Sequence, residues 1–280
     1  MKLLFTTTLL LFGIPLSGQY NYGLEVEQHD AKIEGKLNLD SGNQNVFIGS
    51  NVGINNIDGS ANSFIGKGAG YSNTSGSLNS ILGYAAGSGN TSGDFNSFFG
   101  GFAGHLTDTG DSNSFFGSNS GFANITGDEN CFIGRDAGVN NYFGSWNTSI
   151  GNSSGSRNTT GERNTFIGRY AGDKNKAGSY NIAIGHGAGP SYNNPNQSNR
   201  LYIDQVVGSP TGNDSPLIYG EFDNDLVRIN GTLHISETAK LEPQSAAPTY
   251  ATNDMGTLYA DTGGVLYFCN GTAWRTVQLN

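Results

Sequence analysis

Few side chains in this 280-residue chain could act as acids, bases or nucleophiles, and those few are spread along the sequence. The acidic residues of the middle region stand near glycines, one or two at a time: Asp58, Asp94, Asp111, Asp128, Glu129 and Glu162. An enzyme of the polysaccharide-lyase kind needs several carboxylates with a lysine or arginine around one groove. Carboxylates placed singly are typical of solvated turns, so we predict no enzyme, no catalytic site and no cofactor.

Metal chemistry has little support in the sequence. The four histidines are scattered: His29, His105, His186 and His234. The two cysteines cannot complete an ordinary zinc site without several histidines beside them. The Gly-Gly-x-Gly-x-Asp repeat of calcium-binding β-rolls does not occur, although a structural ion on the turn acids stays open. We predict that Cys131 and Cys269 are free and largely buried, because a disulfide would require the far end of the chain to fold back.

The strongest pattern is a repeat, and its elements must position most of the side chains named above. The motif Asn-x-Phe-Ile-Gly and its close variants recur every 17 residues without insertion or deletion. The nine copies begin at Asn45, Asn62, Asn79, Asn96, Asn113, Asn130, Asn147, Asn164 and Asn181. Such strict spacing predicts that each copy is one turn of a coil, stacked in register on the next. At about 4.8 Å per turn, the stack would form a stiff rod of roughly 40 Å.

One unit, Asn62 to Leu78, indicates β-structure. Its first four residues are β-prone. Glycines at three fixed positions, which are Gly66, Gly70 and Gly76 in this unit, can adopt positive φ and are expected at corners. These breakers leave room for two short strands and two turns but not for a helix. We therefore predict an all-β fold, a parallel β-solenoid or β-roll of nine 17-residue turns, with small β modules at both ends.

Three further columns repeat with the same period. The asparagine that opens each copy is expected to hydrogen-bond along the stack, as identical amides do in stacked strands. A second asparagine column, from Asn56 to Asn175, is expected to cap the other turn, with Thr107 replacing asparagine once. A column of small residues, such as Ala69, fits a tight interior position on the second strand.

Two adjacent columns are apolar, and they carry the most information about assembly. The first runs Phe47, Phe64, Ile81, Phe98, Phe115, Phe132, Ser149, Phe166, Ala183; the second runs Ile48, Ile65, Leu82, Phe99, Phe116, Ile133, Ile150, Ile167, Ile184. Adjacent strand residues point to opposite faces, so both faces would need to be buried. Identical chains packed around a common axis, as in a cyclic trimer, would achieve this. The alternative is that a glycine corner turns both columns into a single core.

Composition and hydrophobicity argue against two classes of partner, and the N-terminus has the pattern of a targeting signal. Charged residues make up 13% of the chain and the net charge is −9, which argues against nucleic-acid binding. No segment after the N-terminus approaches a membrane-spanning length, so we predict no such segment in the mature chain. Residues 1–18 read as a secretory signal peptide, with Lys2, an apolar run and Leu16-Ser17-Gly18.

The boundaries of the other regions follow from the alternation of apolar and polar residues and from the positions of turn residues. Residues 19–41 are predicted to form an N-terminal β cap over the first turn, and residues 42–189 form the repeats. Residues 190–236 are predicted to be a β connector, 237–253 a linker and 254–280 a C-terminal β-meander. The aromatic residues of the meander are the preferred place for contact with a partner, unless they simply form its core: Tyr259, Tyr267, Phe268 and Trp274.

Copies such as Asn164-Thr165-Phe166-Ile167-Gly168-Arg169-Tyr170-Ala171-Gly172 resemble the repeats of bacterial secreted fibre proteins and phage tail-fibre stalks. More distantly, they resemble the head domains of trimeric autotransporter adhesins, whose repeat is shorter. The segment from Leu201-Tyr202-Ile203-Asp204 to Asn230-Gly231-Thr232-Leu233 resembles the connector that follows such repeats in Bacteroidetes-type proteins, and Gly271-Thr272-Ala273-Trp274 resembles modules on fibre tips. The resemblance implies a left-handed, trimeric β-roll and a role in surface attachment.

Together these patterns favour a secreted, non-catalytic fibre or adhesin component that binds a surface receptor, a glycan or another fibre subunit. A phage-like receptor-binding fibre is an alternative, although a secretory signal is out of place in one. An ice-binding solenoid is a second alternative, which would need a flat outward array of threonine. The column that could supply that array is mixed: Val46, Ser63, Ser80, Ser97, Ser114, Cys131, Thr148, Thr165 and Ile182.

Overall fold

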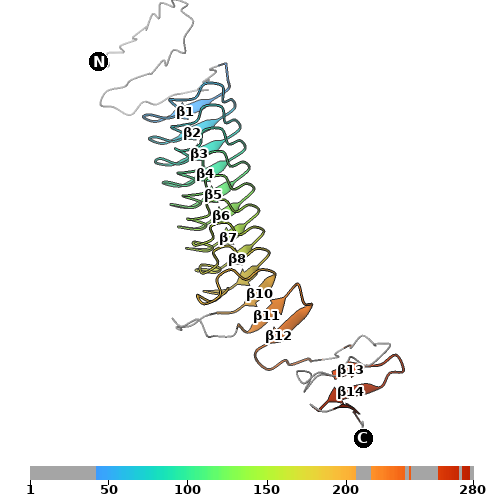
Figure 1. Ribbon diagram of the computed structural model, residues 1–280. Coiled ribbons are helices and arrows are strands. Elements are labelled where there is room, and N and C mark those ends of the chain that lie inside the picture. The colour runs from blue at the N-terminus through green and yellow to red at the C-terminus, as the bar shows by residue number, and fades with distance from the viewer. Residues whose placement is uncertain (1–41, 206–215, 237–239, 241–257, 271–272, 278–280) are drawn as a thin grey trace, which may run out of the picture.

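The computed structural model describes residues 42–205, 216–236, 240, 258–270 and 273–277, and these residues form β-strands and turns without a helix (Figure 1). Nothing in this part of the chain is a helix that could cross a membrane. The signal peptide and the N-terminal cap predicted for residues 1–41 lie outside the described residues, as does all of the predicted linker except residue 240.

Nine three-residue strands recur once per repeat, and two small groups follow them. The repeat strands are β1 (Val46–Ile48), β2 (Ser63–Ile65), β3 (Ser80–Leu82), β4 (Ser97–Phe99), β5 (Ser114–Phe116), β6 (Cys131–Ile133), β7 (Thr148–Ile150), β8 (Thr165–Ile167) and β9 (Ile182–Ile184). The later strands are β10 (Arg200–Ile203), β11 (Ile218–Glu221), β12 (Leu226–Ile229), β13 (Leu258–Ala260), β14 (Leu266–Cys269) and β15 (Trp274–Thr276).

The first twelve strands form one sheet in sequence order, β1 to β12. Strands β1 to β10 are parallel, and each repeat strand pairs with the equivalent residues one unit later; Phe98, for example, lies opposite Phe115. Strands β11 and β12 are antiparallel to their neighbours and close the C-terminal end. Figure 1 shows the repeat strands one above another in a straight stack of coils. The predicted β-solenoid of nine turns is confirmed, while its handedness and its trimeric state stay predictions.

The expectation of two strands per turn is wrong, because the second side of each coil forms no strand. Its backbone still bonds between turns: the N–H groups of Gly70, Ser72 and Thr74 donate to carbonyls of the next turn at 3.0, 3.0 and 2.8 Å. Gly70 has a φ of 56°, which lies outside the extended region. A buried asparagine follows it three residues later, and its side chain takes part of the bonding that a strand would provide.

The interior of the coil holds one apolar column from the strands and one small-residue column from the second side. Phe98 and Phe115 are fully buried, and their rings stack with centroids 4.9 Å apart. Ala103 from the second side is also fully buried, which confirms the predicted tight interior position. Ser149 interrupts the phenylalanine column, and the core divides there into two clusters.

Two asparagine ladders run through the interior, as the repeat predicts. The Asn62 backbone N–H donates to Asn45 Oδ1 at 2.8 Å, and Asn62 Nδ2 donates to the Gly76 carbonyl at 2.8 Å. In the second ladder, Asn73 Nδ2 donates to Asn56 Oδ1 at 2.7 Å and to the same Gly76 carbonyl at 2.9 Å. One glycine carbonyl per turn therefore joins both ladders, which satisfies polar groups that water cannot reach.

The glycine prediction is correct at two corners and wrong at the third. Gly66 and Gly70 have φ values of 126° and 56°, in agreement with the expected corners. Gly76 does not have positive φ. This position requires glycine because an added Cβ would lie 2.5 Å from the Gly93 carbonyl oxygen. The left-handed residue of that corner comes two positions later and is often bulky, as with Leu78 at φ 60° and Phe95 at φ 58°.

The regions after the repeat agree with the sequence in outline. The region predicted as a β connector contributes β10, β11 and β12. Strands β13, β14 and β15 make the predicted antiparallel meander. Both cysteines are free. Cys269 is buried as expected, whereas Cys131 is only half-buried, because its strand position faces outward.

Candidate interaction surface

The outward side of the repeat strands presents one continuous apolar column, which we call the outward stripe. It is the second apolar column of the sequence, from Ile48 to Ile184. Eight of its nine residues are 36–46% exposed, while the ninth, Phe99, is half-buried. The neighbouring residue on each strand points the opposite way into the core, as period-two alternation requires.

The alternative in which both apolar columns share one core is therefore wrong. The residues of the two apolar columns lie on opposite faces of one sheet. The inward set is Phe47, Phe64, Phe98, Phe115, Phe132 and Phe166; the outward set is Ile48, Ile65, Phe99, Phe116, Ile133 and Ile167. Phe47 is half-buried because no described turn lies beyond β1, and the other five inward rings are buried.

The outward stripe continues beyond the repeat, which sequence reasoning missed. In register, Ile184 lies opposite Ile203, Ile203 opposite Ile218, and Ile218 opposite Ile229. All twelve strands of the sheet thus carry an apolar residue in the same column, although the last three strands follow no 17-residue spacing. The signal available in the sequence was the alternation within each late strand. The persistence of the stripe across unrelated segments indicates a use for the whole face.

Exposure of the stripe to water is unfavourable for an isolated rod. Full burial of one such side chain stabilises a protein by about 1.5–3 kcal/mol, and contiguous apolar patches of this kind mark interaction sites. Neighbouring side chains shield one another only partly: the rings of Phe99 and Phe116 stack with centroids 4.8 Å apart. Phe116 is still 41% exposed despite that contact.

One corner beside the stripe carries large side chains; we call it the first corner. It consists of the residue directly before each column asparagine: Gln44, Ala61, Leu78, Phe95, Ser112, Glu129, Trp146, Arg163 and Tyr180. All of them have left-handed φ, which costs a bulky residue about 1–3 kcal/mol. The Arg163 guanidinium lies 4.1 Å from the Trp146 ring centroid and 5.5 Å from that of Tyr180. Large side chains are thus retained at strained positions along one edge of the face.

The opposite edge, which we call the second corner, follows the first glycine of each unit. It runs Ser50, Lys67, Tyr84, Gly101, Ser118, Arg135, Asn152, Arg169 and His186. This column contains three lysine or arginine residues and no carboxylate. Tyr84 packs edge-on against Phe102 with centroids 5.2 Å apart, and Phe102 packs against His105 at 5.3 Å.

The acidic residues weighed as catalytic candidates do not converge. Backbone N–H groups of the preceding turn donate to them: Ser77 to Asp94 at 2.6 Å, Asp94 to Asp111 at 2.7 Å, and Asp111 to Asp128 at 2.8 Å. They act as turn caps along the first corner. Within the described ranges, no three His, Cys, Asp or Glu side chains are grouped closely enough to hold a metal ion.

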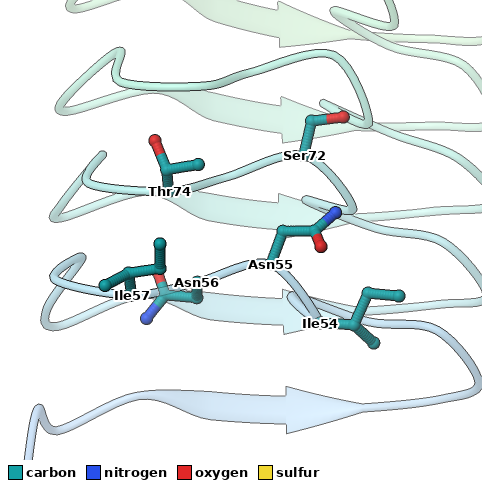
Figure 2. Close-up of a pocket in the computed structure, with 6 residues that line it drawn as sticks. All are labelled: Ile54, Asn55, Asn56, Ile57, Ser72 and Thr74. Carbon is teal, nitrogen blue, oxygen red and sulfur yellow. The ribbon is translucent and has the colours of Figure 1, made fainter.

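An open depression lies on the second side of the first two turns. It is lined by Ile54, Asn55, Asn56, Ile57, Ser72 and Thr74, and Figure 2 shows these side chains on neighbouring coils. None of them is titratable, and Asn56 is committed to the buried ladder. Ile54 and Ile57 leave about half or more of their surface exposed, at 49% and 63%. The depression can make apolar and amide contacts but offers no acid–base chemistry.

The hydroxyl column considered for ice binding lies on the same face as the stripe. Each strand points its first and third residues outward, so Ser63 lies beside Ile65 and Thr165 beside Ile167. Only Thr148 and Thr165 are threonines in this column. The face therefore combines a small hydroxyl row with an aliphatic and aromatic row.

The aromatic residues proposed for partner contact divide between the two faces of the meander. Tyr259 pairs with Tyr267 in the register of the strands, and Trp274 pairs with Cys269, so the Tyr267 and Trp274 side chains share one face of the sheet. Phe268 lies on the other face, opposite Leu258, and is 40% exposed. Tyr267 donates a hydrogen bond to Asp261 Oδ2 at 3.2 Å. The four aromatics therefore do not form a single contact surface.

Comparisons with known proteins give no further identification. No family model matches the chain, and no curated protein or solved structure matches it.

Proposed function

We propose that this protein is a secreted, non-catalytic structural fibre or adhesin component, in which rods associate as a homotrimer through the outward stripe. The observation that carries the proposal is the stripe itself, which runs in register over all twelve strands of the sheet. A partner that covers such a face must offer apolar surface with the same axial repeat. Another copy of the chain meets that requirement.

A closed ring of three rods suits this geometry. Each rod presents one straight apolar face, and a cyclic arrangement buries all three faces against each other at a common axis. The result is a stiff rod whose outer sides are the coils' second side and the corners. Such a shaft suits attachment at a cell surface, where its partner would be a receptor, a glycan or another fibre subunit.

The mass of the purified mature protein in solution tests the assembly, and light scattering coupled to size exclusion measures it. We expect a trimer. Phe116→Ser removes an aromatic ring from the stripe and should shift the equilibrium toward monomer. Phe143→Ser is the matched control, because Phe143 is 53% exposed but stands outside the stripe. A monomeric wild-type protein, or equal effects of the two variants, would contradict the proposal.

Ice binding is the second candidate, and one observation favours it. The hydroxyl and apolar rows lie side by side on a regular outward face whose rows repeat at the spacing of the strands, about 4.8 Å. Thermal hysteresis decides between the two functions. We expect none, because the face is covered in the assembled rod. A monomer that shows hysteresis would favour ice binding and displace the fibre proposal.

A further inference from the structure

We infer that the rods of the assembly run parallel and in register, with the first corner of one protomer against the second corner of the next, so that Glu129 meets Arg135 of the neighbouring protomer. This inference rests on the proposed function, since it requires that rods associate through the outward stripe. A closed ring of identical rods is parallel and unshifted by symmetry. The inference adds which side chains meet across each interface, and the charges of the corners give evidence for that arrangement that is independent of the stripe.

Symmetry limits the possible contacts between corners. When two faces pack with their rods parallel, or three close around an axis, the first corner of one rod faces the second corner of its neighbour. When two faces pack antiparallel about a two-fold axis, each corner faces its own copy. The charges on the corners therefore distinguish the two arrangements.

The second corner disfavours the antiparallel arrangement. Its charged residues, Lys67, Arg135 and Arg169, are all basic. Arg135 Nε lies 3.0 Å from Asp136 Oδ2 of its own chain, but the Arg135 side chain is 70% exposed, so a neighbouring protomer can still reach it. Packed against its own copy, this corner would bring positive charge against positive charge. Such contacts suppress association, whereas complementary charges promote it.

The first corner supplies the complementary charge. Glu129 belongs to it, and the neighbouring cap column contains Asp94, Asp111, Asp128 and Glu162. A parallel arrangement places this mainly acidic edge of one rod beside the basic edge of the next. The corner residue Arg163 is an exception that is neutralised within its own chain, because it lies 3.1 Å from Glu162.

The register follows from matching the corners turn by turn. The two corners of one turn are six residues apart, so unshifted parallel rods pair Leu78 with Tyr84, Phe95 with Gly101 and Glu129 with Arg135. These pairs join apolar to apolar, large to small and acid to base. A shift of one turn in either direction places Glu129 beside Ser118 or Asn152 instead.

The same register also brings Arg163 toward Arg169, which is its one unfavourable pair. Both guanidinium groups are already engaged within their own chain. Arg163 donates to the Tyr180 hydroxyl at 3.2 Å, and Arg169 donates to that of Tyr170 at 3.2 Å. The stripe alone repeats at every turn and is therefore compatible with slipped registers. The corners, rather than the stripe, select one of them.

Spin-label distances test the direction of the rods. The full-length protein with Cys131→Ser and Cys269→Ser would carry one label at Ser50→Cys, in the first turn, or at Ser118→Cys, in the fifth. Both serines are exposed. Parallel rods give similarly short distances between labels at both positions. Antiparallel rods give a short distance at Ser118 but one longer by roughly 40 Å at Ser50, because eight turns of about 4.8 Å separate the ends.

Charge exchange tests the register. Arg135→Glu or Glu129→Arg alone should weaken association about tenfold, and the double variant should recover most of it. Arginine is tolerated in the first corner, since Arg163 occupies it with a φ of 54°. A double variant no better than the single ones would overturn the Glu129–Arg135 contact alone. A long Ser50 distance in an assembled protein would overturn both this contact and the cyclic arrangement of the rods. A monomeric wild-type protein would instead overturn the proposed function.

Discussion

At the scale of single residues, asparagine provides the buried polar structure of the coil. Each ladder member is satisfied by the members above and below it, so one different residue breaks the chain of bonds. Thr107 is such a residue: it is fully buried, its Oγ1 has no partner, and neither has Asn90 Oδ1 on the neighbouring turn. Asn124 keeps only its bond to the Gly127 carbonyl, at 2.7 Å, as a donor.

Thr107→Asn should therefore stabilise the protein. The new amide can donate to Asn90 Oδ1 and accept from Asn124, which removes buried unsatisfied atoms that each cost about 1–3 kcal/mol. Urea unfolding should show a gain in free energy of unfolding of about 1–3 kcal/mol. The reciprocal change, Asn73→Thr, creates the same break in an intact part of the ladder and should cost a similar amount. Loss of stability on Thr107→Asn would contradict this account of the ladder.

The reactivity of Cys131, a single residue on the outward face of β6, reports whether that face is covered. Burial raises the pKa of its thiol, because a low-polarity environment disfavours the thiolate. Alkylation, which requires the thiolate, should therefore begin to accelerate at a higher pH than in the unfolded chain. Cys269→Ser isolates the signal, and urea-unfolded protein gives the reference rate. If rods associate through the stripe, Cys131 should react faster on dilution; a rate independent of protein concentration would contradict coverage of this face.

At the scale of elements, the sequence predicted what depends on the repeat and missed what depends on backbone detail. The position of each strand and the burial of Phe98 followed from periodicity and alternation. The second side was predicted as a strand because its spacing allows one, but the left-handed glycine and the asparagine ladder occupy its backbone instead. The extension of the stripe to Ile229 needed the register of β10 to β12, which no fixed spacing reveals.

Two adjacent glycines allow a position that requires glycine to be compared with a position that does not. Gly100 has a φ of 142°, and an added Cβ would lie 2.5 Å from the Gly117 carbonyl oxygen. Gly101 has no positive φ and nothing within 4 Å of such a Cβ. Gly100→Ala should cost several kcal/mol, about the sum of backbone strain and a steric clash.

Gly101→Ala should be neutral or stabilise by about 0.4–1 kcal/mol, because alanine restricts the unfolded chain. Thermal unfolding of the two variants in parallel provides the measurement, and each serves as the other's control. Equal effects would mean that close stacking of turns does not determine the first glycine of each unit.

At the scale of the whole molecule, the rod is a one-dimensional stack in which each turn contacts only its neighbours. Its stability is then close to a sum over turns and interfaces, and its length can change without a change of fold. The repeat carries no insertion over nine units, which agrees with a surface that must stay straight. A rod of this kind tolerates the loss of an entire turn but not of part of one.

Deletion of residues 79–95 tests this property. It removes one 17-residue unit and joins Leu78 to Asn96, so the Asn96 backbone N–H can donate to Asn62 Oδ1 as that of Asn79 does at 2.9 Å. The variant should fold cooperatively and shorten by about 5 Å, which small-angle scattering measures. Deletion of residues 79–87 alone is the control: it shifts every later residue out of its column, buries polar groups without partners and should prevent folding. Equal damage from both deletions would mean that long-range contacts, rather than the stacking of equivalent turns, hold the rod together.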